Sequence, residues 1–192
     1  MKKKKLFSLA VIVICLSIIG GGTLAYFTDS TTAHNVITTG NIDIEIIETT
    51  DGENPFVDVT GVMPGMEVDK IVQVSNEGAN DAWVRLKVDK QITLANGTVN
   101  EEDENLIIRY NLGDAPEQWT YAQDNENQNY YYYYNSLLKP GQKTTPLFKD
   151  VLFDKKMGNE YQNSTAQVYV FAQATQGDNN GKTVLEADGW PQ

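Results

Sequence analysis

The sequence has almost no cysteine and almost no histidine. Among its 192 residues there is one cysteine, Cys15, and one histidine, His34. A disulfide framework within the chain and an HExxH zinc site, which needs two histidines, are therefore excluded. A serine triad would have to use His34, and the chain has neither a GxSxG elbow nor a phosphate-binding glycine loop. We expect no catalytic residue, no metal ligand and no cofactor, although the 26 acidic residues leave a paired-carboxylate glycosidase open.

Basic residues are also scarce. The chain has 15 lysines and arginines against 26 aspartates and glutamates, which gives a net charge of −11. Four of the 15 lie at Lys2–Lys5, so the chain beyond its leading segment is more acidic still, at about −15. This excess of negative charge repels phosphate groups, so neither nucleic acid nor an anionic membrane surface is an expected partner. The ordinary consequence of the charge is solubility, and cation binding is the alternative.

Residues 1–25 have the three-part layout of a secretory signal peptide. A basic start is followed by the apolar run Leu6–Ile19, and the segment ends with the small residues Thr23 and Ala25. A signal peptidase accepts small side chains before the cut, so we expect cleavage between Ala25 and Tyr26. The alternative is a retained anchor, but the run holds about 14 residues whereas a bilayer needs about 20. Membrane contact is therefore expected only through the uncleaved signal.

Alternation of apolar and polar residues dominates the rest of the chain. The stretch Ile42–Ile46 alternates isoleucine with charged residues, which predicts a half-buried strand. Val84–Val88 repeats the pattern, and Ala166–Ala174 is apolar on both faces at its middle, which predicts a strand inside a sheet. Turn signals such as Asn96-Gly97 separate these segments. Short strands, regular turns and the lack of a long helical pattern predict an all-β sandwich.

Five consecutive tyrosines stand out in the second half of the chain. In a strand, successive side chains point to opposite faces, so one interpretation is a strand with one tyrosine face buried and the other at the surface. The alternative is an adhesive aromatic surface for carbohydrate or a neighbouring subunit, since tyrosine supplies contact area at low entropic cost. The candidates for this aromatic surface are Tyr130, Tyr131, Tyr132, Tyr133 and Tyr134.

Several short motifs occur together in a fixed order. Gly20–Asp29 reads GGGTLAYFTD, and Gly40 precedes the first alternating strand. Further along, Val62–Gly65 reads VMPG, Leu138–Gly141 reads LKPG, and Trp190 lies near the end. In this order the motifs resemble those of the TasA/camelysin family, whose members are exported through a dedicated SipW-type signal peptidase.

The resemblance implies a jelly-roll-like β-sandwich that is secreted to the cell surface and takes part in an extracellular matrix or biofilm fibre. In that family a strand near the mature amino terminus pairs with the next subunit. The implied partners are the SipW-type signal peptidase and further copies of this chain or related matrix subunits. Some relatives are labelled metalloproteases, but this sequence has no zinc-ligand motif. The implied assembly strand contains Tyr26, Phe27, Thr28 and Asp29.

Together these observations divide the chain into three parts. Residues 1–25 are the expected signal-peptide helix, 26–35 a flexible segment and candidate donor strand, and 36–192 a single antiparallel β-sandwich of the jelly-roll or Ig-like kind. The expected function is that of a secreted structural protein of the cell surface or extracellular matrix, as a biofilm fibre subunit or accessory. A secreted binding module for polysaccharide or host protein is the alternative, and a camelysin-like metalloprotease is a third hypothesis.

The position of the cut gives a first prediction. Amino-terminal sequencing of the protein from culture supernatant should begin at Tyr26, because Thr23 and Ala25 are the small residues that a signal peptidase selects. A strain that lacks the SipW-type peptidase should retain the precursor. A start beyond Asp29, or a full-length membrane-bound product in the normal strain, would contradict this prediction.

Overall fold

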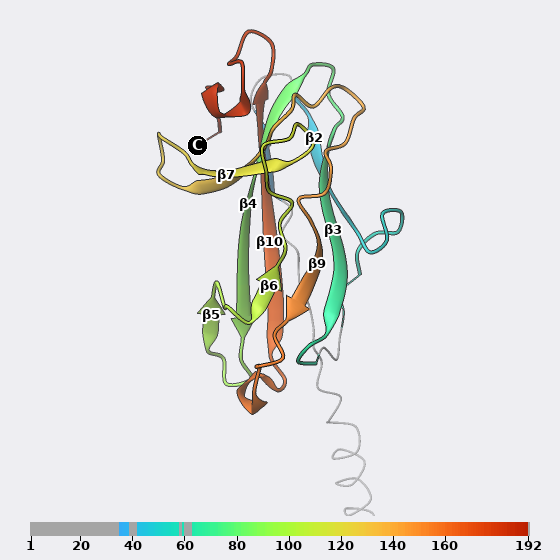
Figure 1. Cartoon of the computed structure of the whole chain (residues 1–192), viewed down its shortest axis with the longest axis vertical. Helices are drawn as coiled ribbons and strands as arrows, with labels where there is room; N and C mark the ends of the chain where they lie inside the picture. The colour runs from blue at the N-terminus through green and yellow to red at the C-terminus, as the bar shows by residue number, and fades with distance from the viewer. Residues whose placement is uncertain (1–34, 39–41, 58, 60–62, 192) are drawn as a thin grey trace, which may run out of the picture.

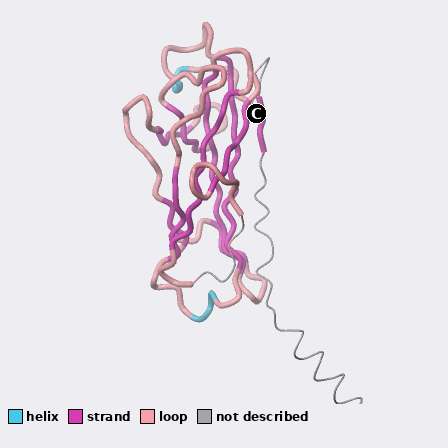
Figure 2. Tube along the Cα trace, turned by 90° about the vertical axis from the view of Figure 1, so that its right-hand side faces the viewer, coloured by secondary structure: helices cyan, strands magenta, loops and turns pink. Residues whose placement is uncertain are grey.

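The computed structural model describes residues 35–38, 42–57, 59 and 63–191. Within these ranges ten strands form two sheets that face each other along the long axis of the molecule, and loops gather at both ends (Figures 1 and 2). The expected signal helix, the cleavage site at Ala25 and Tyr26, and the assembly-strand residues Tyr26 to Asp29 lie outside the described residues.

The larger sheet contains six strands. Its order is β1 (Asn35–Thr38), β10 (Thr165–Gln176), β4 (Ala82–Thr93), β8 (Tyr130–Tyr134) and β7 (Trp119–Gln123), and β5 (Val99–Glu101) pairs with the far end of β4. The four strands of the smaller sheet run in the order β2 (Ile44–Thr49), β3 (Glu67–Asn76), β9 (Phe148–Phe153) and β6 (Leu106–Ile108). Neighbours are antiparallel except β1 and β10, which are parallel. The expected all-β antiparallel sandwich is confirmed, with one parallel pair at its edge.

Helical structure is minor in the described part of the chain. It consists of two 3-10 turns, η1 (Asn159–Tyr161) and η2 (Val184–Glu186). The described residues contain no helix with the length and hydropathy needed to cross a lipid bilayer.

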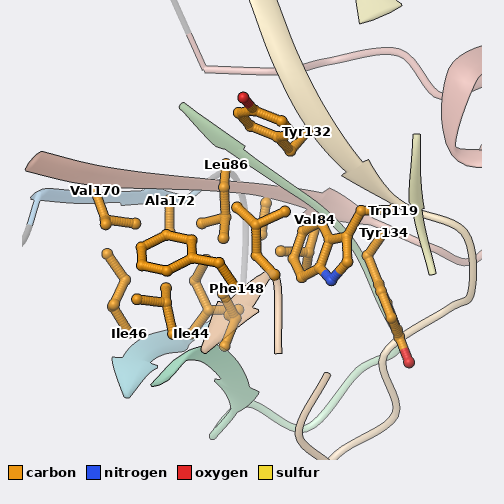
Figure 3. Packing of buried hydrophobic residues seen from close by; sticks show 14 of the residues in the cluster. Ile44, Ile46, Val84, Leu86, Trp119, Tyr132, Tyr134, Phe148, Val170 and Ala172 are labelled. Carbon is orange, nitrogen blue, oxygen red and sulfur yellow. The ribbon is translucent and has the colours of Figure 1, made fainter. Parts of the chain in front are cut away.

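Alternation along the strands decides which side chains enter the core. Ile44 and Ile46 of β2 are 4% and 6% exposed, whereas Glu45 between them is exposed. Figure 3 shows how the two sheets meet: Leu86 of β4 approaches Phe148 of β9, and both side chains are almost completely buried. The burial of such apolar surface is the main favourable contribution to folding. The strand predicted at Ile42–Ile46 is present as β2, but it begins at Ile44 and continues to Thr49.

The longest pairing joins β4 to β10. Each strand has 12 residues, and the register runs from Ala82 opposite Gln176 to Thr93 opposite Thr165. β10 lies between β4 and β1, so the prediction that its residues form a strand inside a sheet is confirmed. The other strands of the larger sheet flank this pair: β1 lies beside β10, and β8 and β5 lie beside β4.

The predicted turn at Asn96-Gly97 connects β4 to β5. Leu94 N donates to Thr98 O at 2.8 Å, and Thr98 N donates to Asn96 Oδ1 at 2.9 Å. Gly97 has φ of +86°, a conformation that costs glycine little because it has no Cβ. The turn is confirmed, and it fixes the register of this hairpin.

Candidate functional site

The strands that the structure describes cover one edge of the larger sheet along only part of its length. β4 pairs with one side of β10 over all 12 residues. On the other side β1 has 4 residues and pairs with Phe171–Ala174. Over Thr165–Val170, none of the strands that the structure describes pairs with that side of β10. A sheet edge without a neighbouring strand offers backbone N–H and C=O groups to another chain. With respect to the described strands, this side of β10 is a candidate acceptor for an added strand.

The tyrosine run forms β8, between β4 and β7. Its side chains alternate as a strand requires. Tyr132 and Tyr134 enter the core between the sheets, whereas Tyr131 and Tyr133 join a second apolar cluster on the opposite face of the larger sheet. β8 is therefore surrounded by apolar side chains on both faces.

The carboxyl-terminal segment covers that second face. Val184, Ala187 and Trp190 pack over β8 and are 3% to 8% exposed. The expectation of an aromatic surface made by the whole run is therefore wrong, because a segment distant in sequence covers one face and the smaller sheet covers the other. Tyr131, Tyr132, Tyr133 and Tyr134 are between 3% and 9% exposed, and of the five only Tyr130, at 50%, lies at the surface.

A buried arginine lies at the centre of the second cluster. Arg85 of β4 is 0% exposed, and its Nη1 forms an ion pair with Asp124 in the turn between β7 and β8. Its Nε donates to Gln173 Oε1 at 2.7 Å. The guanidinium carbon lies 3.9 Å from the ring centroid of Tyr131 and 4.5 Å from that of Trp190. The two rings and the carboxylate supply part of the compensation that a desolvated cation requires, while Nη2 is buried without a hydrogen-bond partner among the described residues.

Polar contacts hold the carboxyl-terminal segment in place. Gln173 Nε2 donates to Pro191 O at 3.2 Å, and Trp190 Nε1 donates to Ala187 O at 2.9 Å. Trp83 Nε1 donates to Asn180 O at 2.7 Å, which ties the loop before this segment to β4. The segment is thus fastened at its start and at its end, above the guanidinium.

The electrostatics of Asp124 follow from this arrangement. Burial raises the pKa of Asp124, but hydrogen bonds from the backbone N–H groups of Asn127 and Glu126 and from Arg85 outweigh burial, so the pKa lies below its usual value. The carboxylate is therefore ionised at neutral pH, as a partner for Arg85 must be.

The described residues offer no metal centre. No group of three or more His, Cys, Asp or Glu side chains among them is arranged to hold a metal ion. His34 and Cys15 lie outside the described residues, and so does the expected assembly strand.

The family model described as camelysin metallo-endopeptidase matches residues 1–113. The chain belongs to the camelysin family. The resemblance to the TasA/camelysin family is thereby confirmed. The matched part of this camelysin-family chain ends before β7, so the tyrosine run and the carboxyl-terminal cover lie beyond it.

Other comparisons add little to the camelysin assignment. No curated protein matches the chain. Among solved structures, one match is the CBM3a-L domain with flanking linkers from scaffoldin cipA of the Clostridium thermocellum cellulosome, at 13% identity, covering 69% of this chain and 88% of that chain. The TM-score is 0.22, which is too low to support an argument about fold or function.

Sequence reasoning missed the arginine cluster. The signal was present in Trp83-Val84-Arg85-Leu86, where a charged residue interrupts a strand whose large residues fall on both faces. A strand that is apolar on both faces is buried on both faces, and a charge within it needs a partner. The identity of that partner, Asp124, is not visible locally because 39 residues separate it from Arg85.

The family description raises the question of proteolysis. We predict no casein hydrolysis by the purified protein with added zinc, since the chain has one histidine and no HExxH pair. The comparison is wild type against His34→Ala, with and without a chelator. Hydrolysis that the chelator abolishes and the substitution removes would overturn this prediction.

A third prediction concerns the ion pair of Arg85. Asp124→Asn should lower the free energy of unfolding at pH 7 by about 3 kcal/mol, because it leaves the buried guanidinium without its anion. Since the pKa of Asp124 is lower folded than unfolded, the stabilisation is complete above the unfolded value of about 4 and is lost as the pH falls through the folded value.

The measurement is denaturant unfolding from pH 7 down to pH 2, and the matched control is Asp89→Asn. Asp89 pairs with Lys87 at the surface, where both side chains are 42% exposed, so its loss should change stability by less than about 1 kcal/mol. Equal effects of the two substitutions at pH 7, or an Asp124→Asn effect that does not shrink in acid, would contradict the prediction.

Proposed function

We propose that the chain is a secreted structural protein of the cell surface or extracellular matrix, which assembles by adding a strand of one copy to the sheet of another. The observation that carries this proposal is the edge of β10, where β1 covers Phe171–Ala174 and no described strand covers Thr165–Val170. Its role is structural and not enzymatic.

The register of β1 supports a choice of donor residues for this edge. Asn35 lies opposite Phe171, and the two strands run in the same direction. A strand continued backward from Asn35 in the same register would bring Asp29–His34 alongside Thr165–Val170. Each backbone hydrogen bond formed there would contribute about 0.5–1.5 kcal/mol net, and burial of Phe27 about 1.5–3 kcal/mol more. Several such contributions together can sustain a polymer.

Export and assembly would then be coupled. Cleavage by a SipW-type signal peptidase between Ala25 and Tyr26 would release the amino-terminal segment from the signal. A free terminus can leave its own sheet edge and pair with another copy at little cost to the rest of the fold. The polymer would therefore form only after export.

Removal of the donor segment tests this mechanism. The protein beginning at Tyr26 should polymerise, whereas a protein beginning at Val36 should remain a monomer with an unchanged far-ultraviolet circular dichroism spectrum. Light scattering and negative-stain microscopy report the difference. If both proteins polymerise alike, or neither does, strand donation is the wrong mechanism for this chain.

A disulfide test then examines the register between copies. The exported chain has no cysteine of its own, so single cysteines report cleanly. Two variants, Ser30→Cys and Ala166→Cys, are mixed before assembly, and neighbouring strands in the proposed register bring the two cysteines within disulfide distance. The mixture should give cross-linked dimers. The matched control is Ser30→Cys mixed with Val99→Cys, an exposed position on β5, and this mixture should give no cross-linked dimers.

A further inference from the structure

The inner face of the β7–β8 hairpin runs from the core into solvent, where β7 projects sideways from the two sheets (Figure 1). Exposure rises from 0% at Trp119 to 51% at Tyr121, and from 8% at Tyr134 to 50% at Tyr130. The cross-strand pairs along this face are Trp119 with Tyr134, Tyr121 with Tyr132, and Gln123 with Tyr130. The last residues on this face, Tyr121, Gln123 and Tyr130, form what we call the tyrosine shelf.

A continuous stack of rings holds the tyrosine shelf in position. The ring centroids of Tyr130 and Tyr121 lie 5.3 Å apart with planes 25° from parallel, and Tyr121 lies 4.7 Å from Tyr132. Tyr132 stacks on Tyr110 at 4.4 Å, and Tyr110 meets the edge of Phe148 in the core at 5.9 Å. Because the exposed rings rest on buried ones, a ligand that packs against them orders few side chains on binding.

Amide groups border the tyrosine shelf. Gln123 Nε2 donates to Gln128 O at 2.9 Å, which fixes this side chain beside Tyr130. The turn that follows is held by Asp124 Oδ1, which accepts the N–H groups of Glu126 and Asn127, both at 2.9 Å. The turn carries neutral hydrogen-bonding side chains in close sequence, namely Asn125, Asn127, Gln128 and Asn129.

The charge around the shelf disfavours an anionic ligand. Burial raises the pKa of Tyr121, and the neighbouring Tyr130 and the carboxylate of Glu102 raise it further, so its phenol stays protonated at neutral pH. A protonated phenol both donates and accepts hydrogen bonds. The negative field of Glu102 and the net charge of −11 oppose the approach of uronates or phosphates.

We propose that the tyrosine shelf binds the hexose units of a neutral polysaccharide. A hexopyranose has a C–H face that packs on an aromatic ring and hydroxyl groups at its rim that bond to amides and phenols. The shelf combines two half-exposed rings, a fixed glutamine and an amide-rich turn, and the charged residues beside it, Glu102 and Glu126, are acidic. Sites that pair an apolar wall with a few placed polar groups recognise ligands of this amphipathic kind.

This inference goes beyond the proposed structural role and does not require it. β7 and β1 lie at opposite ends of the larger sheet, so the shelf is far from the edge proposed for assembly. Binding can be measured on protein at concentrations where it is monomeric. Failure of the shelf to bind sugar and failure of the chain to polymerise are therefore separate results.

The experiment is native affinity electrophoresis of the purified protein in gels that contain galactomannan, barley β-glucan or dextran. Polygalacturonate, an anionic polymer, is a further gel, and a proline-rich peptide is tested by calorimetry. At least one neutral polymer should retard the wild type. Tyr130→Ala and Tyr121→Ala should each weaken the binding about tenfold, since central aromatic contacts dominate such interfaces. Tyr130→Phe, which keeps the ring, should retain most of it.

Two controls keep the result decisive. Val57→Ala removes a side chain that is 70% exposed on the loop after β2, and its binding should equal that of the wild type. Near-ultraviolet circular dichroism reports whether each variant keeps its core. If Tyr121→Ala disturbs the packing of Tyr132, the sugar-binding test rests on Tyr130→Ala alone. Absence of retardation in every neutral gel, binding that survives Tyr130→Ala, or binding only to polygalacturonate or the peptide would overturn the proposal.

Discussion

The burial of the Arg85 guanidinium is the constraint on which the second half of the fold depends. A cation with no exposed surface costs several kcal/mol to desolvate unless an anion and hydrogen-bond acceptors surround it. Its partners come from separate parts of the chain: Asp124 from a hairpin turn, Gln173 from β10, Tyr131 from β8 and Trp190 from the last residues. These contacts tie the hairpin and the carboxyl-terminal segment to β4 and β10. The charge therefore fixes elements that the apolar core alone would leave free to slide.

The same constraint explains why a run of five tyrosines is compatible with a β-sandwich. Two of the rings are needed in the core between the sheets, and two are needed beside the guanidinium, where the face of an aromatic ring stabilises a cation. Only Tyr130 remains at the surface, and it meets Tyr121 there because the hairpin turn is held in place through Asp124. The tyrosine shelf is thus a consequence of how Arg85 is buried, and its rigidity comes from the core.

How far the sequence predicts this structure depends on whether a feature is local. The existence of β2 and the turn at Asn96-Gly97 follow from alternation and from backbone preference, and both were predictable, although β2 lies at Ile44–Thr49 and not at Ile42–Ile46. The burial of both faces of Tyr130–Tyr134 was not predictable from the sequence. The residues that cover one face come after residue 183, and no local pattern indicates that they pack there. The parallel pairing of β1 with β10 was missed for the same reason, since more than 130 residues separate the two strands. The partner of Arg85 also depends on tertiary structure.

The two ends of the larger sheet differ in a way that bears on assembly. In the proposed assembly the donor strand at the amino terminus and the acceptor edge on β10 are different surfaces, so the contact between copies would be heterologous. A heterologous contact that does not close a ring grows into an open polymer. At the opposite end, β7 pairs with β8 and carries the tyrosine shelf, which is separate from the β10 edge. Growth through β10 would therefore leave one shelf exposed on every subunit. Because repeated weak sites on one polymer bind a repeating ligand with high avidity, a modest affinity of each shelf for sugar would suffice to hold a polysaccharide along the fibre.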